Sequence, residues 1–179
     1  MLNQSLSNKL KNVELLITDV DGVLTDGKII ISSNGGESKM FCVEDGTGVA
    51  LAKYSNLKLA FLSGRYSKST EIRAKELGIK YCIQGFLNKK EKLIELCQEI
   101  KVEVDKVAYI GDGIVDIPVL EIVGCPISVP NAHRYAKDKS IYITQANGGE
   151  GVLYEVVELI LNAKEKYQDT INIMKKKVF

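Results

Sequence analysis

The chain has 179 residues, of which 45% are hydrophobic, which is enough for one domain with a substantial buried core. Its 24 lysines and arginines nearly balance its 23 acidic residues, which gives no electrostatic footprint for a nucleic-acid backbone. The longest apolar run, near 152–161, is interrupted by Glu155 and Glu158, so no segment reaches the roughly 20 apolar residues of a membrane-spanning helix. These features exclude nucleic-acid and membrane partners and favour a small molecule.

The N-terminal segment MLNQSLSNKLKNVE lacks the apolar centre and the cleavage site of a secretory signal, so we expect a cytoplasmic protein. The four cysteines are widely spaced and form no C-x-x-C pair. They are Cys42, Cys82, Cys97 and Cys125. This spacing argues against a zinc site and a redox pair, and it predicts reduced thiols that behave as small hydrophobic side chains.

Apolar runs and helical patterns alternate along the chain. The expected strands cover residues 13–18, 58–62, 81–83, 107–110, 127–129 and 141–144. The expected helices cover residues 46–56, 68–77, 89–100, 115–122 and 151–164. This alternation predicts an α/β fold with a doubly wound, mostly parallel, Rossmann-like sheet.

Two further β-rich stretches, 28–32 and 39–43, flank the turn sequence Ser-Asn-Gly-Gly, which predicts a hairpin at about 28–43 that projects after the first strand. No linker divides the chain, so we expect a single domain over residues 1–165. Residues 166–179 are polar and contain three successive lysines, and we interpret them as a solvated C-terminal tail.

Polar residues follow three of the expected strands. Asp19 and Asp21 follow the first strand, Ser63 follows the second, and Asp112 and Asp116 follow the strand at 107–110. Ligands of a doubly wound sheet bind beyond the carboxyl ends of the strands, so we expect these side chains to converge. Clustered carboxylates need a compensating cation, and oxygen ligands without His or Cys select Mg²⁺.

A magnesium site of this kind suits phosphoryl transfer, because Mg²⁺ often binds through one or two carboxylates together with a substrate phosphate. A carboxylate such as Asp19 can act as a nucleophile and form an aspartyl-phosphate. Ser63 and Lys89 supply a hydroxyl and a positive charge for the phosphoryl group, and Lys89 begins an expected helix whose dipole favours anions.

The ordered motifs resemble those of the haloacid dehalogenase superfamily. They are Asp19-Val-Asp21-Gly22-Val-Leu-Thr25-Asp26-Gly27, Leu62-Ser63-Gly64-Arg65, Lys89 and Gly111-Asp112-Gly113-x-x-Asp116. The resemblance implies that Asp19 is the nucleophile and that Asp21 is the general acid and base. It also implies that Ser63 hydrogen-bonds the transferring phosphoryl group and that Lys89 neutralises its charge and orients Asp19.

The same resemblance implies a Mg²⁺ site formed by Asp19, the Asp21 carbonyl and Asp112, with Asp116 supporting the metal ligands or Lys89. The intervals from Asp19 to Ser63 and from Lys89 to Asp112 leave no room for a cap domain. The resemblance therefore implies a capless fold with an open active site. Because the short hairpin has unpaired edges, we expect subunits to associate and cover them.

Within the superfamily, the chain resembles the 3-deoxy-manno-octulosonate 8-phosphate phosphatases. The shared features are the extended TDVDGVLTDG motif, the hairpin, Phe41-x-x-x-Asp45-Gly46-x-Gly48, Ser67 and Arg73 after LSGR, and GGEG. This resemblance implies a capless homotetramer that hydrolyses a sugar-acid phosphate in lipopolysaccharide precursor synthesis. Besides Asp21 and Lys89, the implied substrate contacts are Cys42, Val43, Glu44, Asp45, Gly46, Arg65 and Arg73.

Four positions depart from that family, whose members commonly carry basic residues there. They are Glu44, Ala50, Glu150 and Tyr154. These departures leave open a sialic-acid-type 9-phosphate, which the GGEG turn also suggests, or another small phosphomonoester. A non-catalytic partner module in a sugar-nucleotide pathway is a further alternative, against which the intact catalytic residues argue. Hydrolysis versus phosphotransfer, the oligomer size and the role of the tail also remain open.

Overall fold

Six strands form one parallel sheet in the order β5-β4-β1-β6-β7-β8, in a computed structural model that describes residues 4–178. The strands are β1 Leu15–Thr18, β4 Lys58–Ser63, β5 Tyr81–Gln84, β6 Val107–Ile110, β7 Cys125–Ser128 and β8 Tyr142–Ile143. Strand β1 lies at the centre, where Leu15 is in register with Lys58 of β4 and with Val107 of β6. The carboxyl ends of β1, β4 and β6 therefore lie next to one another.

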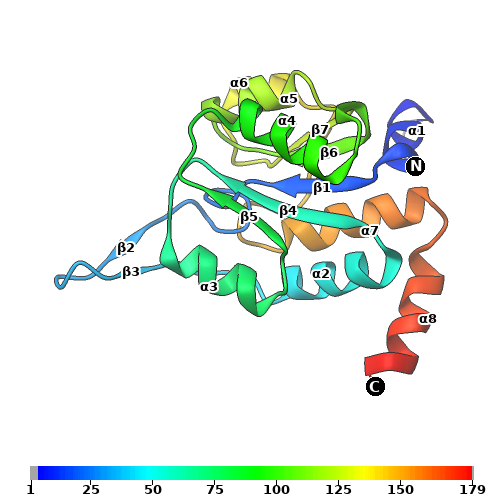
Figure 1. Cartoon of the computed structure of the whole chain (residues 1–179), viewed down its shortest axis with the longest axis horizontal. Helices are drawn as coiled ribbons and strands as arrows, with labels where there is room; N and C mark the ends of the chain where they lie inside the picture. The colour runs from blue at the N-terminus through cyan, green and yellow to red at the C-terminus, as the bar shows by residue number, and fades with distance from the viewer. Residues whose placement is uncertain (1–3, 179) are drawn as a thin grey trace.

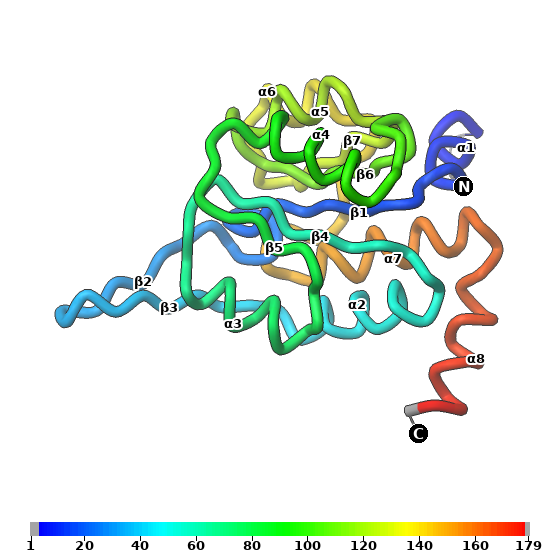
Figure 2. Tube along the Cα trace, viewed as in Figure 1, coloured from blue at the N-terminus to red at the C-terminus, as the bar shows by residue number. Residues whose placement is uncertain are grey.

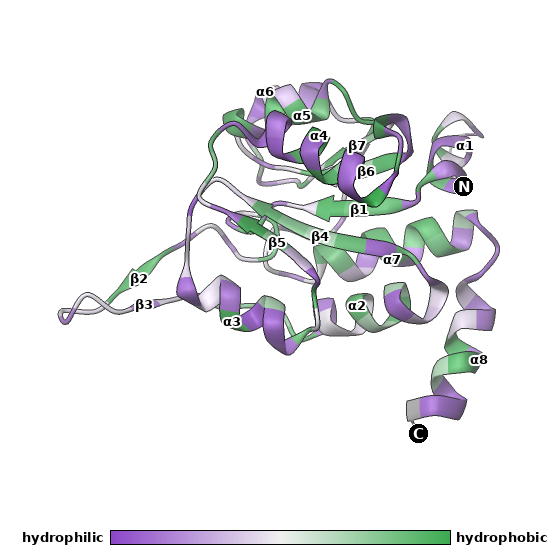
Figure 3. Ribbon diagram, viewed as in Figure 1, coloured by the Kyte–Doolittle hydropathy of each residue, from purple (hydrophilic) through white to green (hydrophobic). Residues whose placement is uncertain are grey.

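Helices cover both faces of the sheet (Figure 1). One side carries α1 Gln4–Asn12, α2 Glu44–Ser55, α3 Lys68–Glu76 and α7 Val152–Ala163. The other side carries α4 Lys89–Ile100, α5 Ile117–Leu120 and α6 Arg134–Asp138, with short 3-10 turns η1 Val104–Lys106 and η2 Ile114–Asp116. A hydrophobic core lies on each face of the sheet, and alternate residues of β1 contribute to both. Leu16 packs under α2 and α7, and Leu15 and Ile17 pack under α4 and α5. Figure 3 shows the hydrophobic strands between more polar outer helix surfaces.

The hairpin β2–β3 leaves the body of the molecule as an arm (Figure 2). Strand β2 Ile30–Ile31 lies within the expected stretch 28–32 but is shorter. Strand β3 Glu37–Ser38 comes before the expected stretch 39–43, so that part of the prediction was wrong. The turn closes through a hydrogen bond from Ser32 N to Gly36 O of 2.8 Å. Ile30 and Ile31 are exposed, so within the described residues β2 and β3 are not supported by packing against a hydrophobic core.

The α/β class, the parallel sheet, the projecting hairpin and the lack of a cap domain confirm the predicted fold class. Helices α1 and α6 are absent from the sequence-based prediction. Helix α1 is mostly polar and buries Leu10 as its anchor, while α6 has only five residues. In α1, Leu6 and Leu10 do lie one turn apart on the face that packs on the core, but two apolar residues in a polar segment are a weak signal.

The suggested C-terminal tail is a helix in the structure, α8 Tyr167–Val178. Tyr167, Ile171 and Met174 share one face at helical spacing and pack against the core under α2 and α7. The Tyr167 hydroxyl lies 3.0 Å from the Tyr154 hydroxyl of α7. This apolar spacing was hidden in the sequence by the many lysines around it.

None of the helices within residues 4–178 combines the length and the apolar character needed to cross a lipid bilayer. All four cysteines are free thiols, and Cys97 and Cys125 are buried. Burial raises the pKa of the Cys125 thiol to about 12, so it is an unreactive core residue.

The close packing of α2 on α7 yields a stability prediction. A Cβ at Gly48 would lie 2.7 Å from Tyr154 Cα, so Gly48→Ala forces the helices apart. We expect Gly48→Ala to lower the free energy of unfolding by about 1–3 kcal/mol, measured by urea denaturation. Gly46→Ala in the same helix is the control, because its Cβ would come no closer than 3.4 Å to Leu77 Cδ2. Equal stability of the two variants would contradict the proposed close packing.

Candidate active site

Three adjacent strands deliver polar residues to one edge of the sheet. Asp19 directly follows β1, Ser63 ends β4, and Asp112 lies one residue beyond Gly111, which follows β6. Asp19 and Ser63 are buried, and Asp112 is partly buried. The parallel register of the sheet thus brings together residues that are far apart in the chain.

Lys89 occupies the centre of this group from the first turn of α4. The Asn88 side chain caps that helix by accepting a hydrogen bond from Glu91 N at 3.4 Å, which fixes where the helix begins. The Lys89 Nζ lies 2.8 Å from Asp19 Oδ2 and 2.7 Å from Asp116 Oδ1, and its side chain is only 1% exposed. A buried ammonium is tolerated here because two carboxylates pair with it.

Asp116 has no free oxygen for another ligand. Its Oδ1 also accepts from the Tyr109 hydroxyl at 2.5 Å, and its Oδ2 accepts from Gly113 N at 2.8 Å and from Asp112 N at 3.1 Å. Asp116 therefore fixes the loop after β6 and one side of Lys89. This arrangement supports the positioning part of its expected role rather than direct metal binding.

The electrostatics of the group call for a cation. Asp19, Asp112 and Asp116 each place one oxygen within 4.8 Å of the others. Burial, followed by repulsion from Asp116, raises the pKa of Asp19 to about 8 and that of Asp112 to about 6. Burial acts to lower the pKa of Lys89, but Asp19 and Asp116 together raise it. One lysine among three carboxylates leaves excess negative charge that a divalent cation beside Asp19 and Asp112 fits.

Glycines let the surrounding loops approach this site. Gly22 has a φ of +93°, and a Cβ there would lie 2.1 Å from Asp112 Oδ2. A Cβ at Gly148 would lie 1.9 Å from the Gly22 carbonyl oxygen, and Gly149 N donates to Val23 O at 2.9 Å. The Gly-Gly-Glu-Gly turn therefore braces the loop that carries Asp19 and Asp21.

Asp21 and Arg65 both contact the base of the hairpin. Lys39 Nζ lies 2.6 Å from Asp21 Oδ1, and the Arg65 guanidinium forms an ion pair with the Glu37 carboxylate. The Ser63 hydroxyl donates to the Arg65 carbonyl at 2.9 Å, which shapes the loop after β4. The structure thus gathers these residues around the strand ends.

Arg73 and residues 42–46 form a second group. Arg73 Nη2 donates to the Cys42 carbonyl at 3.2 Å, while the Asp45 carboxylate is buried and accepts from Leu153 N at 2.9 Å. Val43 is exposed and Glu44 opens α2. Among the described residues, no hydrogen bond or ion pair joins this group to Asp19 or Lys89. Its contact with substrate stays a prediction.

The sequence-based reasoning missed three residues at the site, namely Glu37, Lys39 and Tyr109. Tyr109 belongs to an apolar strand, and its hydroxyl had no local partner to suggest a role. Glu37 and Lys39 lie in the hairpin, where charged side chains are expected to face solvent. Their spacing of two residues was the available signal that they share one side of the chain.

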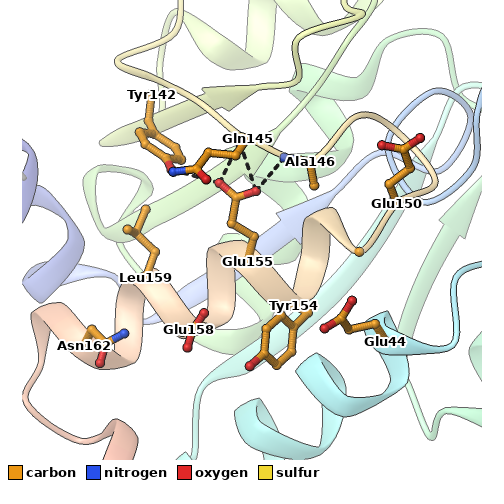
Figure 4. A pocket seen from close by; sticks show the side chains of 11 residues that line it. Glu44, Tyr142, Gln145, Ala146, Glu150, Tyr154, Glu155, Glu158, Leu159 and Asn162 are labelled. Atoms are coloured by element: carbon orange, nitrogen blue, oxygen red, sulfur yellow. Dashed lines mark hydrogen bonds between the residues drawn. The ribbon is translucent and has the colours of Figure 1, made fainter.

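A separate hollow of about 340 Å³ lies between α2, α7 and the loop before α7 (Figure 4). Four glutamates line it, namely Glu44, Glu150, Glu155 and Glu158. Glu155 anchors the loop, because it accepts from Gln145 N, from Ala146 N and from the Tyr142 hydroxyl. Glu44, Glu150 and Tyr154, three of the positions that depart from the resembled family, all face this hollow.

The buried lysine yields a second prediction. Lys89→Met leaves Asp19 and Asp116 without their cation, so we expect the metal-free protein to lose about 3–5 kcal/mol of unfolding free energy. The control is the exposed neighbour, and we expect Lys90→Met to change stability by no more than about 0.5 kcal/mol. Urea denaturation in EDTA measures both. A Lys89→Met protein as stable as the Lys90→Met protein would show that the ion pairs do not hold the site together.

The chain resembles known proteins along most of its length. A family model described as haloacid dehalogenase-like hydrolase matches residues 58–156. The 3-deoxy-D-manno-octulosonate 8-phosphate phosphatase of Salmonella typhi is 40% identical over 161 residues, which cover 90% of this chain and 86% of that protein.

Solved structures of similar proteins share the fold. That of the 3-deoxy-D-manno-octulosonate 8-phosphate phosphatase from Moraxella catarrhalis, in complex with magnesium ion, phosphate ion and KDO molecule, has a TM-score of 0.93 and 40% identity. The alignment covers 97% of this chain and 99% of that one. The cobalt-bound phosphatase from Haemophilus influenzae has a TM-score of 0.85 and 37% identity, with coverage of 89% and 93%.

Proposed function

Because this chain belongs to the haloacid dehalogenase-like hydrolases, and among them to the 3-deoxy-D-manno-octulosonate 8-phosphate phosphatases, we propose that it hydrolyses 3-deoxy-D-manno-octulosonate 8-phosphate to the free sugar acid and phosphate. This reaction makes the enzyme a phosphomonoesterase in lipopolysaccharide precursor synthesis. The observation that carries the proposal is the buried Lys89, which lies between Asp19 and Asp116 at hydrogen-bond distance from both.

Asp19 is the nucleophile in the first half of the reaction. Its carboxylate oxygen forms a bond to phosphorus as the bond from phosphorus to the sugar oxygen breaks, and Asp21 gives that oxygen a proton. Lys89 holds Asp19 Oδ2 and favours the ionised carboxylate needed for attack. The Ser63 hydroxyl, now bound to the Arg65 carbonyl, turns to donate to a phosphoryl oxygen.

Water completes the reaction in the second half. Asp21, now ionised, takes a proton from water as the water oxygen attacks phosphorus, and the bond to Asp19 breaks. Phosphate leaves, and both carboxyl groups return to their starting states. The product of the first half therefore prepares Asp21 for the second.

Magnesium is the cofactor that the donor set fits. Asp19, Asp112 and the carbonyl oxygen of Asp21 would hold it, and it would supply positive charge that offsets the charge of the phosphoryl group. Asp116 would hold the Asp112 loop in place through the Asp112 and Gly113 amides. The negative charge of the carboxylates, which Lys89 balances only in part, supports this assignment.

Substrate recognition rests on Arg65, Arg73 and residues 42–46. A guanidinium can bind the carboxylate of the sugar acid through two parallel hydrogen bonds. Arg65 pairs with the Glu37 carboxylate, and this contact supports the proposal that its guanidinium can pair with a carboxylate of the substrate.

A second candidate substrate is another small phosphate ester, such as a sialic-acid-type 9-phosphate. The Gly-Gly-Glu-Gly turn favours the sialic-acid-type ester. The acidic hollow instead favours an ester without a carboxylate, because Glu44, Glu150 and Tyr154 stand where basic residues are expected for a carboxylated sugar. The catalytic groups and the Mg²⁺ requirement are the same for either substrate.

The proposal includes a homotetramer that works in the cytoplasm. The hairpin exposes apolar side chains, including Ile30, Ile31 and Met40, that another subunit would cover. Free thiols at all four cysteines agree with a reducing compartment. The single domain over residues 1–165 then has α8 as a C-terminal addition.

Phosphate release from a substrate panel tests the function. The panel contains 3-deoxy-D-manno-octulosonate 8-phosphate, a sialic-acid-type 9-phosphate and neutral sugar phosphates, each with Mg²⁺ or with EDTA. We expect the octulosonate ester to give the highest kcat/KM and EDTA to abolish turnover. Asp19→Asn should lose at least about 10³-fold in kcat because it cannot form the aspartyl-phosphate.

The outcomes separate the alternatives. A different preferred ester would replace the substrate and keep the chemistry. Mg²⁺ binding with no turnover of any ester would support the non-catalytic module instead. Phosphate transfer to an added sugar alcohol, in preference to water, would make the protein a phosphotransferase.

A further inference from the structure

Lys39, at the base of the hairpin, is a fully buried cation. Its side chain is 0% exposed, and its Nζ lies 2.6 Å from Asp21 Oδ1 and 3.3 Å from the Thr70 hydroxyl. Glu37 Oε1 is the other carboxylate nearby, at 3.9 Å. A buried ammonium needs a close partner, and Asp21 is the nearest one.

Asp21 has few other restraints. Neither of its carboxylate oxygens accepts a directed hydrogen bond from the described residues, so the close ion pair with Lys39 is its main polar contact. Asp21 also lies next to Gly22, whose φ of +93° belongs to a tight turn rather than a strand or helix. Asp21 Oδ1 is thus paired with the charge of Lys39, while Oδ2 is buried without a partner among the described residues and could carry a proton.

The hairpin base is itself fixed to the body of the protein. Glu37 accepts from the Ser67 hydroxyl at 2.7 Å and pairs with Arg65, and its carbonyl oxygen accepts from the Ser69 hydroxyl at 3.1 Å. Glu37 and Lys39 are two residues apart in an extended segment, so both side chains face the same way. Lys39 therefore reaches Asp21 from an anchored support rather than from a loose arm.

We propose that Lys39 is a positioning residue for the general acid and base, because the anchored hairpin base holds its ammonium against one oxygen of Asp21. The inference rests on the proposed function. Lys39 fixes the direction of the Asp21 carboxylate, so that the free oxygen faces the sugar oxygen and then the attacking water. The hairpin thereby becomes part of the active site of its own chain.

A double-mutant cycle on Lys39 and Asp21 tests the proposal. We expect Lys39→Met to lower kcat about 10- to 100-fold and to leave KM nearly unchanged, which is part of the 10²- to 10⁴-fold that a general acid and base contributes. In the Asp21→Asn background, the same substitution should cost no further activity. Lys39→Arg, which keeps the charge, should recover part of the lost kcat. The assay uses p-nitrophenyl phosphate and the preferred ester.

The matched control is Lys28→Met, on the arm of the hairpin that precedes the turn, whereas Lys39 follows the turn. Lys28 is 83% exposed and pairs with Asp26, so we expect wild-type kinetics. A Lys39→Met loss that persists in Asp21→Asn, or that appears as a raised KM, overturns the positioning role in favour of a structural or substrate-binding one. Wild-type kcat in Lys39→Met overturns it while the proposed function stands. No turnover by the wild-type protein overturns both.

Discussion

The site depends on the burial of one lysine between two carboxylates. Lys89 brings its charge into a region that is almost free of solvent, and this is tolerable because Asp19, which follows β1, and Asp116, in η2 after β6, both pair with it. The same contacts set the spacing between the loops after β1 and β6. Asp19 and Asp116, which neutralise the buried charge of Lys89, therefore also fix where the loops after β1 and β6 lie relative to each other.

The backbone around that ion pair has little freedom. Gly22 approaches Asp112 more closely than any side chain would allow, and the Gly148 turn closes on Gly22 from the other side. Both carboxylate oxygens of Asp116 already have partners, namely Lys89, the Tyr109 hydroxyl and the backbone amides of its own loop. Asp19 has one partner on each oxygen, Val20 N and Lys89, and makes fewer contacts than Asp116, so Asp19 and Asp112 are the carboxylates that can share a cation.

Local patterns in the sequence were sufficient for the sheet and for the strand-end residues. Apolar runs mark the strands, and a parallel sheet gathers whatever follows them, so Asp19, Ser63 and Asp112 could be placed together from sequence. Lys39 and Tyr109 could not be placed, because their contacts depend on how the hairpin base folds onto Asp21 and on how the loop after β6 turns Asp116 back onto the strand. Helix α8 was missed because its apolar face is narrow and its lysines dominate the composition.

The catalytic groups and the recognition groups are supported by separate parts of the fold. The first set is held by strand ends, buried ion pairs and glycines, where few residue types fit. The groups proposed for recognition lie after β4, on α3 and around the start of α2, and Glu44 and Glu150 face solvent beside a hollow, where they can change without disturbing the core. A protein built this way can retain phosphate chemistry while its choice of sugar changes. Changes around the acidic hollow leave the ion pairs of Lys89 intact, because none of the residues that line the hollow contacts that lysine.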